Sequence, residues 1–437
     1  MLQILLVIAL IVLATTKLKL HPFLALLLAA ILMGFLGDLG AAALIDKLVE
    51  GFGSTLRSIG IVIACGTIIG TFLERTGGAQ AIAGFVLKVV GDKNAPLAVS
   101  MTGFLVSIPV FCDSGFVILS AINKALSAKT KTSLTVLAVA LATGLYTTHV
   151  FVPPTPGPLA AAGTLGADVG LVVILGLVAA IPTAGAGLLW ALYYASRFSV
   201  SPEDQPDNSQ IPAEEECDLF RSFAPLLLPL VLIALKSVAD LPSAPLGEGT
   251  LRSVLQFFGH PVIALLTGVL MVVRRKQVPA EVASKWVHES LQNAGSIILI
   301  TGAGGAFGNV LRATGMADDF ASNMSQWQLG VFLPFFIAAV LKTAQGSSTV
   351  AIITTAAMMA PLLEPMEMTA SVAKALVVLA IGAGSMTVSH FNDSFFWVVS
   401  QFSDMDESTA LRCFTAATLV QGLTAIATIA IMASLLT

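Results

Sequence analysis

The chain has 437 residues, of which 56% are hydrophobic and only 11% are charged, and its mean hydropathy is +0.90. Soluble domains carry about 25% charged residues, so this composition excludes an ordinary soluble fold and makes the lipid bilayer the solvent for most of the chain. The net charge of −4 is small and dispersed, so no nucleic acid or other strongly charged macromolecule is predicted as a partner.

Apolar segments long enough to cross a bilayer recur along the chain in two sets of five. A spanning helix needs about 20 apolar residues. The first segment, residues 2–14, has no basic residue before it and no small-residue cleavage site after it, so we interpret it as a retained helix rather than a signal peptide. The first set lies at about 2–16, 22–36, 56–73, 133–150 and 168–196, and the second at about 223–236, 260–273, 295–312, 372–390 and 410–436.

An acidic, proline-containing stretch at residues 197–221 separates the two sets and is typical of a solvated linker. The halves on either side, 1–196 and 222–437, also share a sequence pattern. The segment that starts at Gly66 matches the segment that starts at Gly304 as G-x-x-x-G-x-x-L-x-x-T-G-x-A, without a gap. Although G-x-x-x-G alone merely allows helices to pack closely in lipid, the full pattern indicates an internal repeat.

The positions of lysine and arginine predict that the two repeats are inverted, because short basic loops prefer the cytoplasm. Lys17 and Lys19 follow the first apolar segment, which places the N-terminus outside and the central linker in the cytoplasm. The basic residues 274–276 then also lie in the cytoplasm. Five spans per half is an odd number, so the halves run antiparallel, as in many secondary transporters.

Two apolar segments, residues 95–126 and 330–363, are interrupted near their middle by small and polar residues, which predicts re-entrant helical hairpins. The next span of each half is broken as well, by a proline-rich stretch after Thr147 and a polar stretch after Ser385. Four breaks in corresponding order predict one central binding site, where N–H groups at the start of a returning helix can hold a carboxylate. The predicted fold is an all-α polytopic membrane protein of two inverted repeats, each with a hairpin and a broken helix.

Ionisable residues lie in these breaks. A charge at mid-membrane costs about 2.5 to 3.5 kcal/mol on insertion scales and is rarely kept without a use, so we predict that Asp113, His149, His390 and Asp393 handle substrate or protons. The alternative is that the carboxylates cap the returning helices and the imidazoles bond broken backbone. Structural or interfacial placement is the preferred interpretation of the other candidates, Glu74, Arg75, Arg312, His21, His260 and His288.

Motifs of other function classes are incomplete or missing in the sequence. The glycine run at 302–308 has Phe307 where a dinucleotide loop needs glycine, and no G-x-x-x-x-G-K-[ST] motif occurs, so no cofactor is predicted. The four cysteines have no C-x-x-C spacing, which excludes a thiolate metal site. Two rival functions remain, a channel and an intramembrane hydrolase that uses Ser347 or Ser348 with His390. The repeat explains these residues without a nucleophile, so we prefer a secondary transporter, which is not an enzyme.

Three stretches in the broken segments are distinctive. They read Pro-Val-Phe-Cys-Asp-Ser-Gly-Phe-Val from Pro109, His-Val-Phe-Val-Pro-Pro-Thr-Pro-Gly-Pro from His149, and Ser-His-Phe-Asn-Asp-Ser-Phe-Phe-Trp-Val from Ser389. With them the chain resembles the gluconate permease (GntP) family of the ion transporter superfamily, from His21 almost to the C-terminus. The resemblance implies a proton symporter of the bacterial inner membrane, in which a hairpin-bearing transport domain moves like an elevator against a scaffold domain that forms a homodimer.

The resemblance also implies which residues form the walls of one substrate site. The substrate carboxylate would lie on hairpin N–H groups and hydroxyls, and Asn392, Asp393 and the histidines would bond substrate hydroxyls. Members similar to this chain carry gluconate, other sugar acids, glycerate or D-serine. We favour a gluconate-like sugar acid, then glycerate, then D-serine, and sodium coupling stays open beside proton coupling. The implied wall residues are Asp113, Ser114, Gly115, Thr147, Thr148, His149, Gly346, Ser347, Ser348, Thr349, His390, Asn392, Asp393 and Ser394, of which Asp113, His149, His390 and Asp393 are also the candidates for proton coupling.

Overall fold

Helices are the only regular elements in the part of the chain that the structure describes, which confirms the predicted all-α class. The structure is a computed structural model. It describes positions 6, 7, 10, 11, 13 and 14 and residues 18–91, 94–198, 219–240, 249–274, 278–316, 329–391 and 393–436. The central linker predicted at 197–221 lies almost entirely outside these residues.

Four helical segments within these ranges are long and apolar enough to cross a bilayer alone, and two bent helix pairs raise the number to six if each pair is one span. This is fewer than the ten predicted spans. The predicted span at 2–16 lies mostly outside the described residues, and several other predicted spans are short helices, such as the 15-residue α2 and the 16-residue α17, which end at glycine or at a break.

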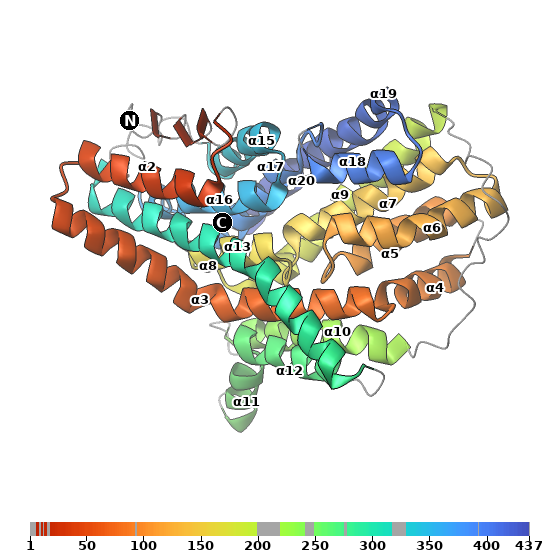
Figure 1. Ribbon diagram of the computed structural model, residues 1–437, viewed down its shortest axis with the longest axis horizontal. Coiled ribbons are helices and arrows are strands. Elements are labelled where there is room, and N and C mark those ends of the chain that lie inside the picture. Colours follow the sequence, from red (N-terminus) through yellow and green to blue (C-terminus); the bar gives the residue numbers. More distant parts are fainter. Residues whose placement is uncertain are drawn as a thin grey trace.

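The first half contains both predicted interruptions. Residues 107–111 separate two helices of a hairpin, and residues 152–155 separate the two parts of a broken helix (Figure 1). The elements are α2 (Pro22–Leu36), α3 (Ala41–Arg75), α4 (Gly78–Val90), the hairpin α5 (Ala95–Val106) and α6 (Cys112–Thr130), the broken helix α7 (Leu134–Phe151) and α8 (Pro156–Leu165), α9 (Val169–Tyr193) and the 3-10 turn η2 (Ala195–Arg197).

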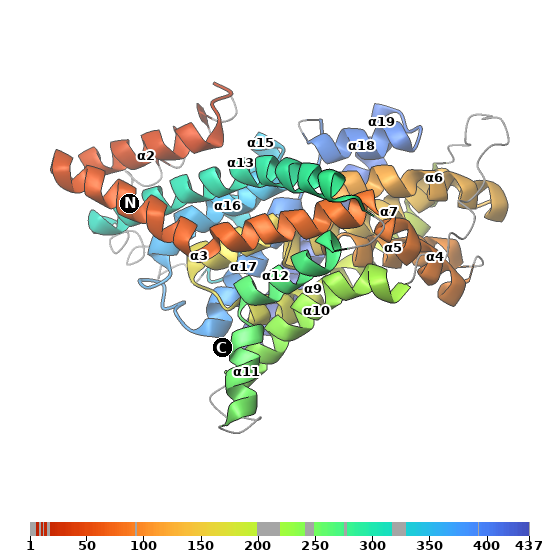
Figure 2. The same cartoon turned by 60° about the horizontal axis from the view of Figure 1, so that its bottom comes forward.

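The second half has the same order of long helix, hairpin, broken helix and long helix among its described residues. Three helices precede this series and pack together on one side of the molecule (Figure 2). The elements are α10 (Leu219–Ala239), α11 (Thr250–Phe258), α12 (Pro261–Val273), α13 (Ala280–Ala313), the hairpin α15 (Phe332–Gln345) and α16 (Ser348–Met359), the turn η4 (Ala360–Leu362), the broken helix α17 (Ser371–Met386) and α18 (Ser394–Phe402), then α19 (Glu407–Ala410), the π-helical turn η5 (Leu411–Thr415) and α20 (Ala416–Leu436).

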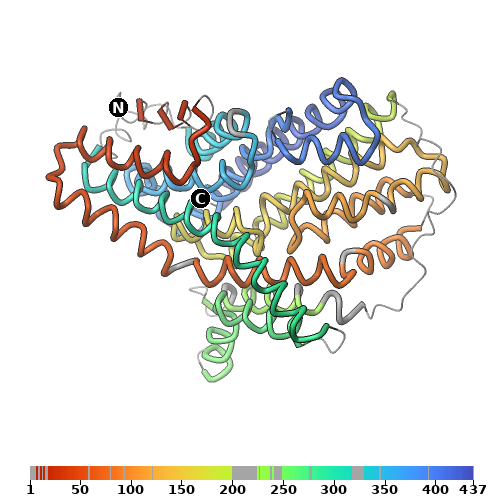
Figure 3. Tube along the Cα trace, viewed as in Figure 1, coloured from red at the N-terminus to blue at the C-terminus, as the bar shows by residue number. Residues whose placement is uncertain are grey.

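The two long helices that carry the repeated glycine pattern, α3 and α13, lie side by side in opposite directions (Figure 3). Near the start of α3, the Lys47 carbonyl accepts from the Asn309 amide, late in α13, at 2.8 Å. At the end of α3, Arg75 pairs with Glu289, early in α13, at 3.2 Å. The pairing of an early residue with a late one at both ends fixes the antiparallel sense.

Both long helices begin well before the apolar segments that predict them. The segment 56–73 belongs to a helix that starts at Ala41, and the segment 295–312 to one that starts at Ala280. The additional turns carry charged residues such as Lys47, which lower the local hydropathy although the backbone stays helical. Hydropathy therefore marks only the most apolar part of each helix.

The broken helix α7–α8 occupies the centre of the protein. Every residue of α7 is buried, and the most apolar part of the segment Leu134–Leu165 has the composition of a membrane span although protein encloses it. Outer helices instead expose large apolar side chains, among them Ile181 (68%) and Tyr193 (73%) on α9. Such exposed apolar surface suits contact with lipid, and the enclosed α7 suits a site at the centre.

Candidate functional site

The first hairpin breaks upstream of the residues predicted to form its tip. The break comprises residues 107–111 and contains a proline, which has no N–H to donate. The helix α6 begins at Cys112, so Asp113, Ser114 and Gly115 form its first turn and are helical. An acidic residue in a first turn stabilises the N-terminus of a helix. The predicted interruption at 107–115 therefore contains the observed break, whereas the residues implied as its tip, Asp113 to Gly115, follow the break and are helical.

The second hairpin breaks at two residues. Gly346 ends α15 with a backbone φ of 83°, a left-handed conformation that suits glycine. Ser347 then caps α16, because its hydroxyl accepts from the Val350 N–H at 3.3 Å. Ser348 and Thr349 lie in the first turn of α16, and the tip prediction holds for Gly346 and Ser347.

In the broken helix of the first half, the predicted interruption at 147–158 contains the observed break, but its first residues are still helical. Thr147, Thr148 and His149 belong to the last turns of α7, and the non-helical residues are 152–155. A threonine is compatible with a helix when its hydroxyl bonds the preceding turn, and the Thr147 hydroxyl donates to the Thr143 carbonyl at 2.7 Å. Only the following prolines force the backbone out of the helix.

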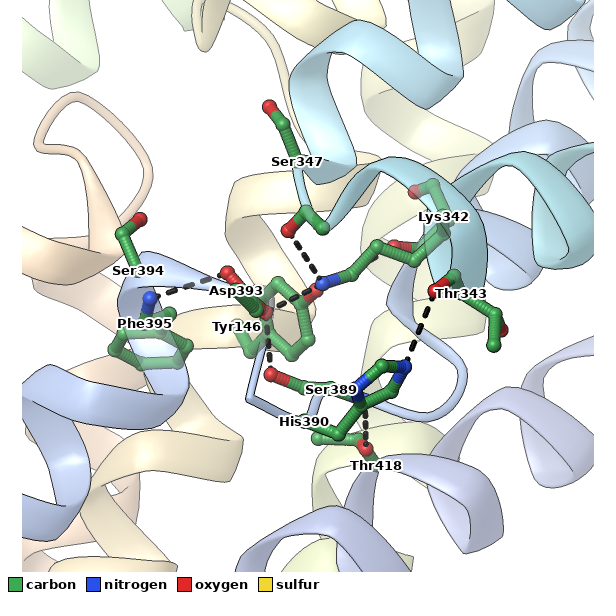
Figure 4. Close-up of polar contacts among 12 residues, drawn as sticks. Tyr146, Lys342, Thr343, Ser347, Ser389, His390, Asp393, Ser394, Phe395 and Thr418 are labelled. Atoms are coloured by element: carbon green, nitrogen blue, oxygen red, sulfur yellow. Dashed lines mark hydrogen bonds and ion pairs between the residues drawn. The ribbon is translucent and has the colours of Figure 1, made fainter. Parts of the chain in front are cut away.

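Asp393 is the centre of the polar contacts in the second break (Figure 4). Its carboxylate forms an ion pair with Lys342 of α15 and accepts a hydrogen bond from the Ser389 hydroxyl. Its other oxygen accepts from the Phe395 N–H at 3.1 Å, so Asp393 also caps α18. The Lys342 side chain is fully buried and that of Asp393 is 6% exposed, and the ammonium also donates to the Gly346 carbonyl at 2.9 Å. The pair joins the second hairpin to the second break.

Tyr146 of α7 lies under this ion pair. The Lys342 ammonium is 5.9 Å from the centre of the Tyr146 ring, within the range of a cation–π interaction. The Tyr146 hydroxyl lies 3.4 Å from the Ser385 carbonyl and hydrogen-bonds Ser348 at the start of α16. Its ring also packs against Phe395, with ring centres 5.3 Å apart. One buried side chain of the first half thus touches the second hairpin and both sides of the second break.

Asp113 lies where the first hairpin meets the second break. Its carboxylate accepts from the Ser394 hydroxyl at 2.8 Å, and the Cys112 thiol lies 3.5 Å from it. The neighbouring Ser114 hydrogen-bonds the Glu74 carboxylate at the end of α3. Because Ser394 is exposed, this part of the cluster can be reached from outside the protein, unlike the Lys342 pair.

The two predicted histidines have different surroundings. His149 is buried, its Nδ1 has no hydrogen-bond partner among the described residues, and its ring lies 5.9 Å from that of Phe111 in the first hairpin break. His390 is partly exposed, and its Nε2 lies 3.1 Å from the Thr343 carbonyl on α15. The remaining predicted wall residue, Asn392, lies outside the described residues.

Two glycines of the repeated pattern bring the first-half breaks against α3. A methyl group on Gly66 would lie 2.8 Å from the Pro154 carbonyl oxygen, and one on Gly70 would overlap the Pro109 carbonyl. The hairpin break and the helix break of the first half therefore lie one turn apart on the same face of α3. Close approach of broken backbone is a reason for glycine at both positions.

The four breaks lie close together, because side-chain contacts join both hairpins to the second break and the break at 152–155 lies one turn of α3 from the first hairpin break. The Asp113–Ser394 contact connects the first hairpin to the second break, and the Phe111–His149 contact connects the first hairpin to α7. Two contacts, Lys342–Asp393 and His390–Thr343, connect the second hairpin to the second break. Lys342 and Tyr146 were missed as site residues by the sequence reasoning. A lysine inside an apolar hairpin is itself a signal of function, which could have identified Lys342.

The candidates interpreted as anchors make structural contacts. Arg75 pairs with Glu289, and the Arg312 guanidinium donates to the Ala360 carbonyl at 2.8 Å. His21 accepts from the Phe23 N–H at 3.3 Å and caps α2. A cavity of about 150 Å³ beside Arg312 lies between α3, α8 and α13, away from the Lys342 pair. Arg75, Arg312 and His21 do not belong to the cluster where the breaks meet, whereas Glu74 contacts it through Ser114.

Comparison with known proteins gives relatives over nearly the whole chain. The family model described as GntP family permease matches residues 1–436. An uncharacterized permease of Haemophilus influenzae is 37% identical over 89% of this chain and 83% of its own length. A gluconate permease of Pseudomonas aeruginosa is 34% identical over 94% and 92%, and the D-serine transporter DsdX of Escherichia coli K12 is 31% identical over 96% and 95%.

Two solved structures share the fold. The YdaH transporter of Alcanivorax borkumensis superposes with a TM-score of 0.66 over 95% of this chain and 98% of its own, at 16% identity. MtrF of Neisseria gonorrhoeae, described as an antimetabolite efflux pump, superposes with a TM-score of 0.67 over 96% of both chains, at 14% identity. At these identities the likeness concerns the arrangement of helices alone.

Proposed function

Because the chain belongs to the GntP family of permeases, we propose that it is a secondary active transporter that carries a small hydroxycarboxylate together with protons. The protein is a multi-pass membrane transporter and not an enzyme. We further propose that it lies in a bacterial inner membrane as a homodimer, with its N-terminus outside and the linker at 197–221 in the cytoplasm.

The observation that carries the proposal is the buried contact between Lys342 and Asp393 where the four breaks meet. Burying ionised side chains within a membrane protein costs free energy, so such residues are rare, and they are typical of substrate and proton pathways. A site between paired broken segments is typical of secondary transporters. We assign proton exchange to the carboxylates Asp113 and Asp393, and the exposed Ser394 supports an approach from outside.

A sugar acid or glycerate is the proposed substrate because the cluster offers partners for both ends of such a molecule. N–H groups at the starts of α6 and α16 suit a carboxylate. Hydroxyls of Ser348 and Ser394 and the imidazoles of His149 and His390 suit substrate hydroxyls. One relative is named a gluconate permease and another a D-serine transporter, so a hydroxylated carboxylate is common to their named substrates.

We also propose that residues 1–196 and 222–437 are inverted repeats and that the hairpins and broken helices move together as a transport domain. The antiparallel contact of α3 with α13 supports the inversion, since these helices carry the matching glycine pattern. The packing of α7, α15, α16, α17 and α18 around one cluster supports a unit that moves as a body.

Uptake into proteoliposomes tests the proposed function. The purified full chain is reconstituted, and labelled gluconate, glycerate and D-serine are offered under an inward pH gradient or an inward sodium gradient. We expect saturable accumulation of gluconate or glycerate with the pH gradient, and counterflow when unlabelled substrate is inside. Uptake that follows only sodium removes proton coupling, and flux without accumulation or counterflow indicates a channel.

A further inference from the structure

Lys342 is a buried cation whose role in substrate binding or transport is not yet assigned. A lysine ammonium has three N–H donors, and the Asp393 carboxylate and the Gly346 carbonyl both accept from it. These acceptors lie on two different elements, the tip of the second hairpin and the second break. The ammonium therefore holds two of the four breaks together from the inside.

The charged and titratable groups around this pair come from several elements. The first hairpin and α7 both contribute groups that lie near enough to interact with the Asp393 charge, and His390 precedes it in the same break. In this set Lys342 is the one lysine or arginine, and Asp113 is the second carboxylate. The facing groups are Lys342, Cys112, Asp113, Tyr146, His149 and His390.

We propose that Lys342 is the residue that binds the substrate carboxylate, and that Asp393 takes its place on the ammonium when no substrate is present. The inference rests on the proposed function and deepens it. Substrate carboxylate and one proton enter together: the Lys342–Asp393 ion pair opens, the substrate carboxylate pairs with Lys342, and the proton from solution binds the released Asp393 carboxylate. The number of buried charges is the same before and after.

Compensation of buried charge is the physical reason why substrate binding is coupled to proton binding. A buried carboxylate that has lost its cation and stays ionised is strongly unfavourable, so a substrate anion alone would leave one uncompensated negative charge inside the protein. The proton removes that charge. A monocarboxylate and a proton then cross together without net charge movement.

The surroundings of Asp393 suit a protonated state as well as an ionised one. Its first oxygen keeps the hydrogen bond from the Phe395 N–H in both states. Its second oxygen, once protonated, can donate to the Ser389 hydroxyl, because a hydroxyl can donate or accept. Asp393 can therefore lose Lys342 without leaving its place.

The surroundings of Lys342 suit an external carboxylate. The helix α16 starts two residues after Gly346, and the N–H groups of a first helical turn have no backbone partner within the helix. A carboxylate on Lys342 would thus also face the N-terminus of α16 and the Ser348 hydroxyl, which lies beside Tyr146. The Lys342 ammonium and the N-terminus of α16 could therefore contact the same substrate carboxylate.

Calorimetry with the purified full chain and gluconate tests this exchange. We expect the wild type to take up one proton for each gluconate bound, measured by comparing buffers of different ionisation enthalpy, and to bind more tightly as pH falls. Asp393→Asn should bind gluconate without proton uptake and with an affinity that no longer depends on pH. Proteoliposomes that contain the Asp393→Asn variant should retain gluconate counterflow but should no longer accumulate gluconate under a pH gradient.

Substitution of the lysine tests the other half of the exchange. Lys342→Met should weaken gluconate binding at least about tenfold, the loss expected for a charge-assisted contact. Because a single substitution leaves Asp393 unpaired, the double variant Lys342→Met/Asp393→Asn is also measured; it should elute as a folded protein and fail to bind. Matched controls are Lys236→Met and Asp240→Asn, an ion pair at the end of α10 that should leave binding and proton uptake unchanged.

Two results overturn the inference while the proposed function stands: proton uptake by Asp393→Asn equal to that of the wild type, or wild-type affinity in the folded double variant. Proton-linked gluconate binding without accumulation in liposomes removes the transport proposal and leaves the exchange intact. If the wild type binds glycerate or D-serine instead, the same variants are measured with that ligand. Binding of none of the three overturns both.

Discussion

The hydroxyl of Ser394, in the first turn of α18, donates to the carboxylate of Asp113, in the first turn of α6, at 2.8 Å. The bond joins the first hairpin to the break of the second half, 281 residues away in the sequence. It is exposed, whereas the Lys342–Asp393 pair behind it is buried. The Asp113–Ser394 bond is therefore an outer connection between the first hairpin and the second break, and the Lys342–Asp393 pair is an inner connection between the second hairpin and the same break.

Removal of the outer connection should slow transport without unfolding the protein. We expect Ser394→Ala to lower kcat/KM for gluconate uptake about tenfold, because a hydrogen bond to a charged group contributes about 1.5 kcal/mol at the low end of its range. Uptake kinetics in proteoliposomes measure the effect. Ser434→Ala, which removes an exposed hydroxyl near the end of α20, is the control. Unchanged uptake kinetics in Ser394→Ala would show that the Ser394 hydroxyl has no role in transport.

His149 should be required for transport and not for stability. Its buried Nδ1 bonds no described residue, so replacement by an apolar side chain of similar size removes a desolvation cost and no hydrogen bond at that atom. We expect His149→Leu to keep or raise the thermal unfolding temperature and to raise the KM for gluconate about tenfold. His288→Leu, on an exposed position of α13, serves as control. A stable variant with wild-type KM would make His149 a packing residue.

A side chain at Gly70 should destabilise the protein. A methyl group there meets the Pro109 carbonyl, and overpacking of this kind costs about 1–3 kcal/mol. We expect Gly70→Ala to lower the unfolding temperature in detergent. The control is Gly53→Ala in the same helix, where the added methyl meets open space and better helix propensity contributes up to about 1 kcal/mol. Equal stability of the two variants would contradict the close approach of the first hairpin to α3.

The antiparallel contact of α3 and α13 can be tested by exchanging charges. Arg75→Glu should lower stability by about 0.2–1 kcal/mol, the range of an exposed ion pair, with a larger loss at low salt. Adding Glu289→Arg should restore most of the loss. The measurement is thermal unfolding in detergent at two salt concentrations. Failure of the second substitution to compensate the first would show that the two side chains do not meet.

The sequence was sufficient to locate the breaks, because prolines and polar residues inside apolar segments have few alternatives in a bilayer. The predicted interruptions also included helical residues, Asp113–Gly115 after the first hairpin break and Thr147–His149 before the helix break, because the sequence could not show that these residues satisfy their polar groups within helices. Threonine bonding to the preceding turn and an acidic first turn are local effects that hydropathy does not resolve.

The partners within the site could not be predicted in the same way. Lys342 and Asp393 are 51 residues apart, and only the packing of α15 against α17 brings the hairpin and the break together. The hydroxyl of Thr147 illustrates the opposite error, since it bonds Thr143 and Gln421 inside the protein although its position suggested a substrate contact. Which polar group faces a ligand and which faces the protein is decided by tertiary structure.

The complete enclosure of α7 separates Tyr146 and His149 from the membrane itself. Acyl chains, headgroups and bilayer thickness act on the outer helices, whose apolar side chains are exposed, while these two buried residues have no contact with lipid. A change in lipid composition therefore alters the mechanical surroundings of the transporter and leaves the local polarity of its central cluster unchanged. Selectivity for the solute is set by the protein, independently of the membrane in which it is placed.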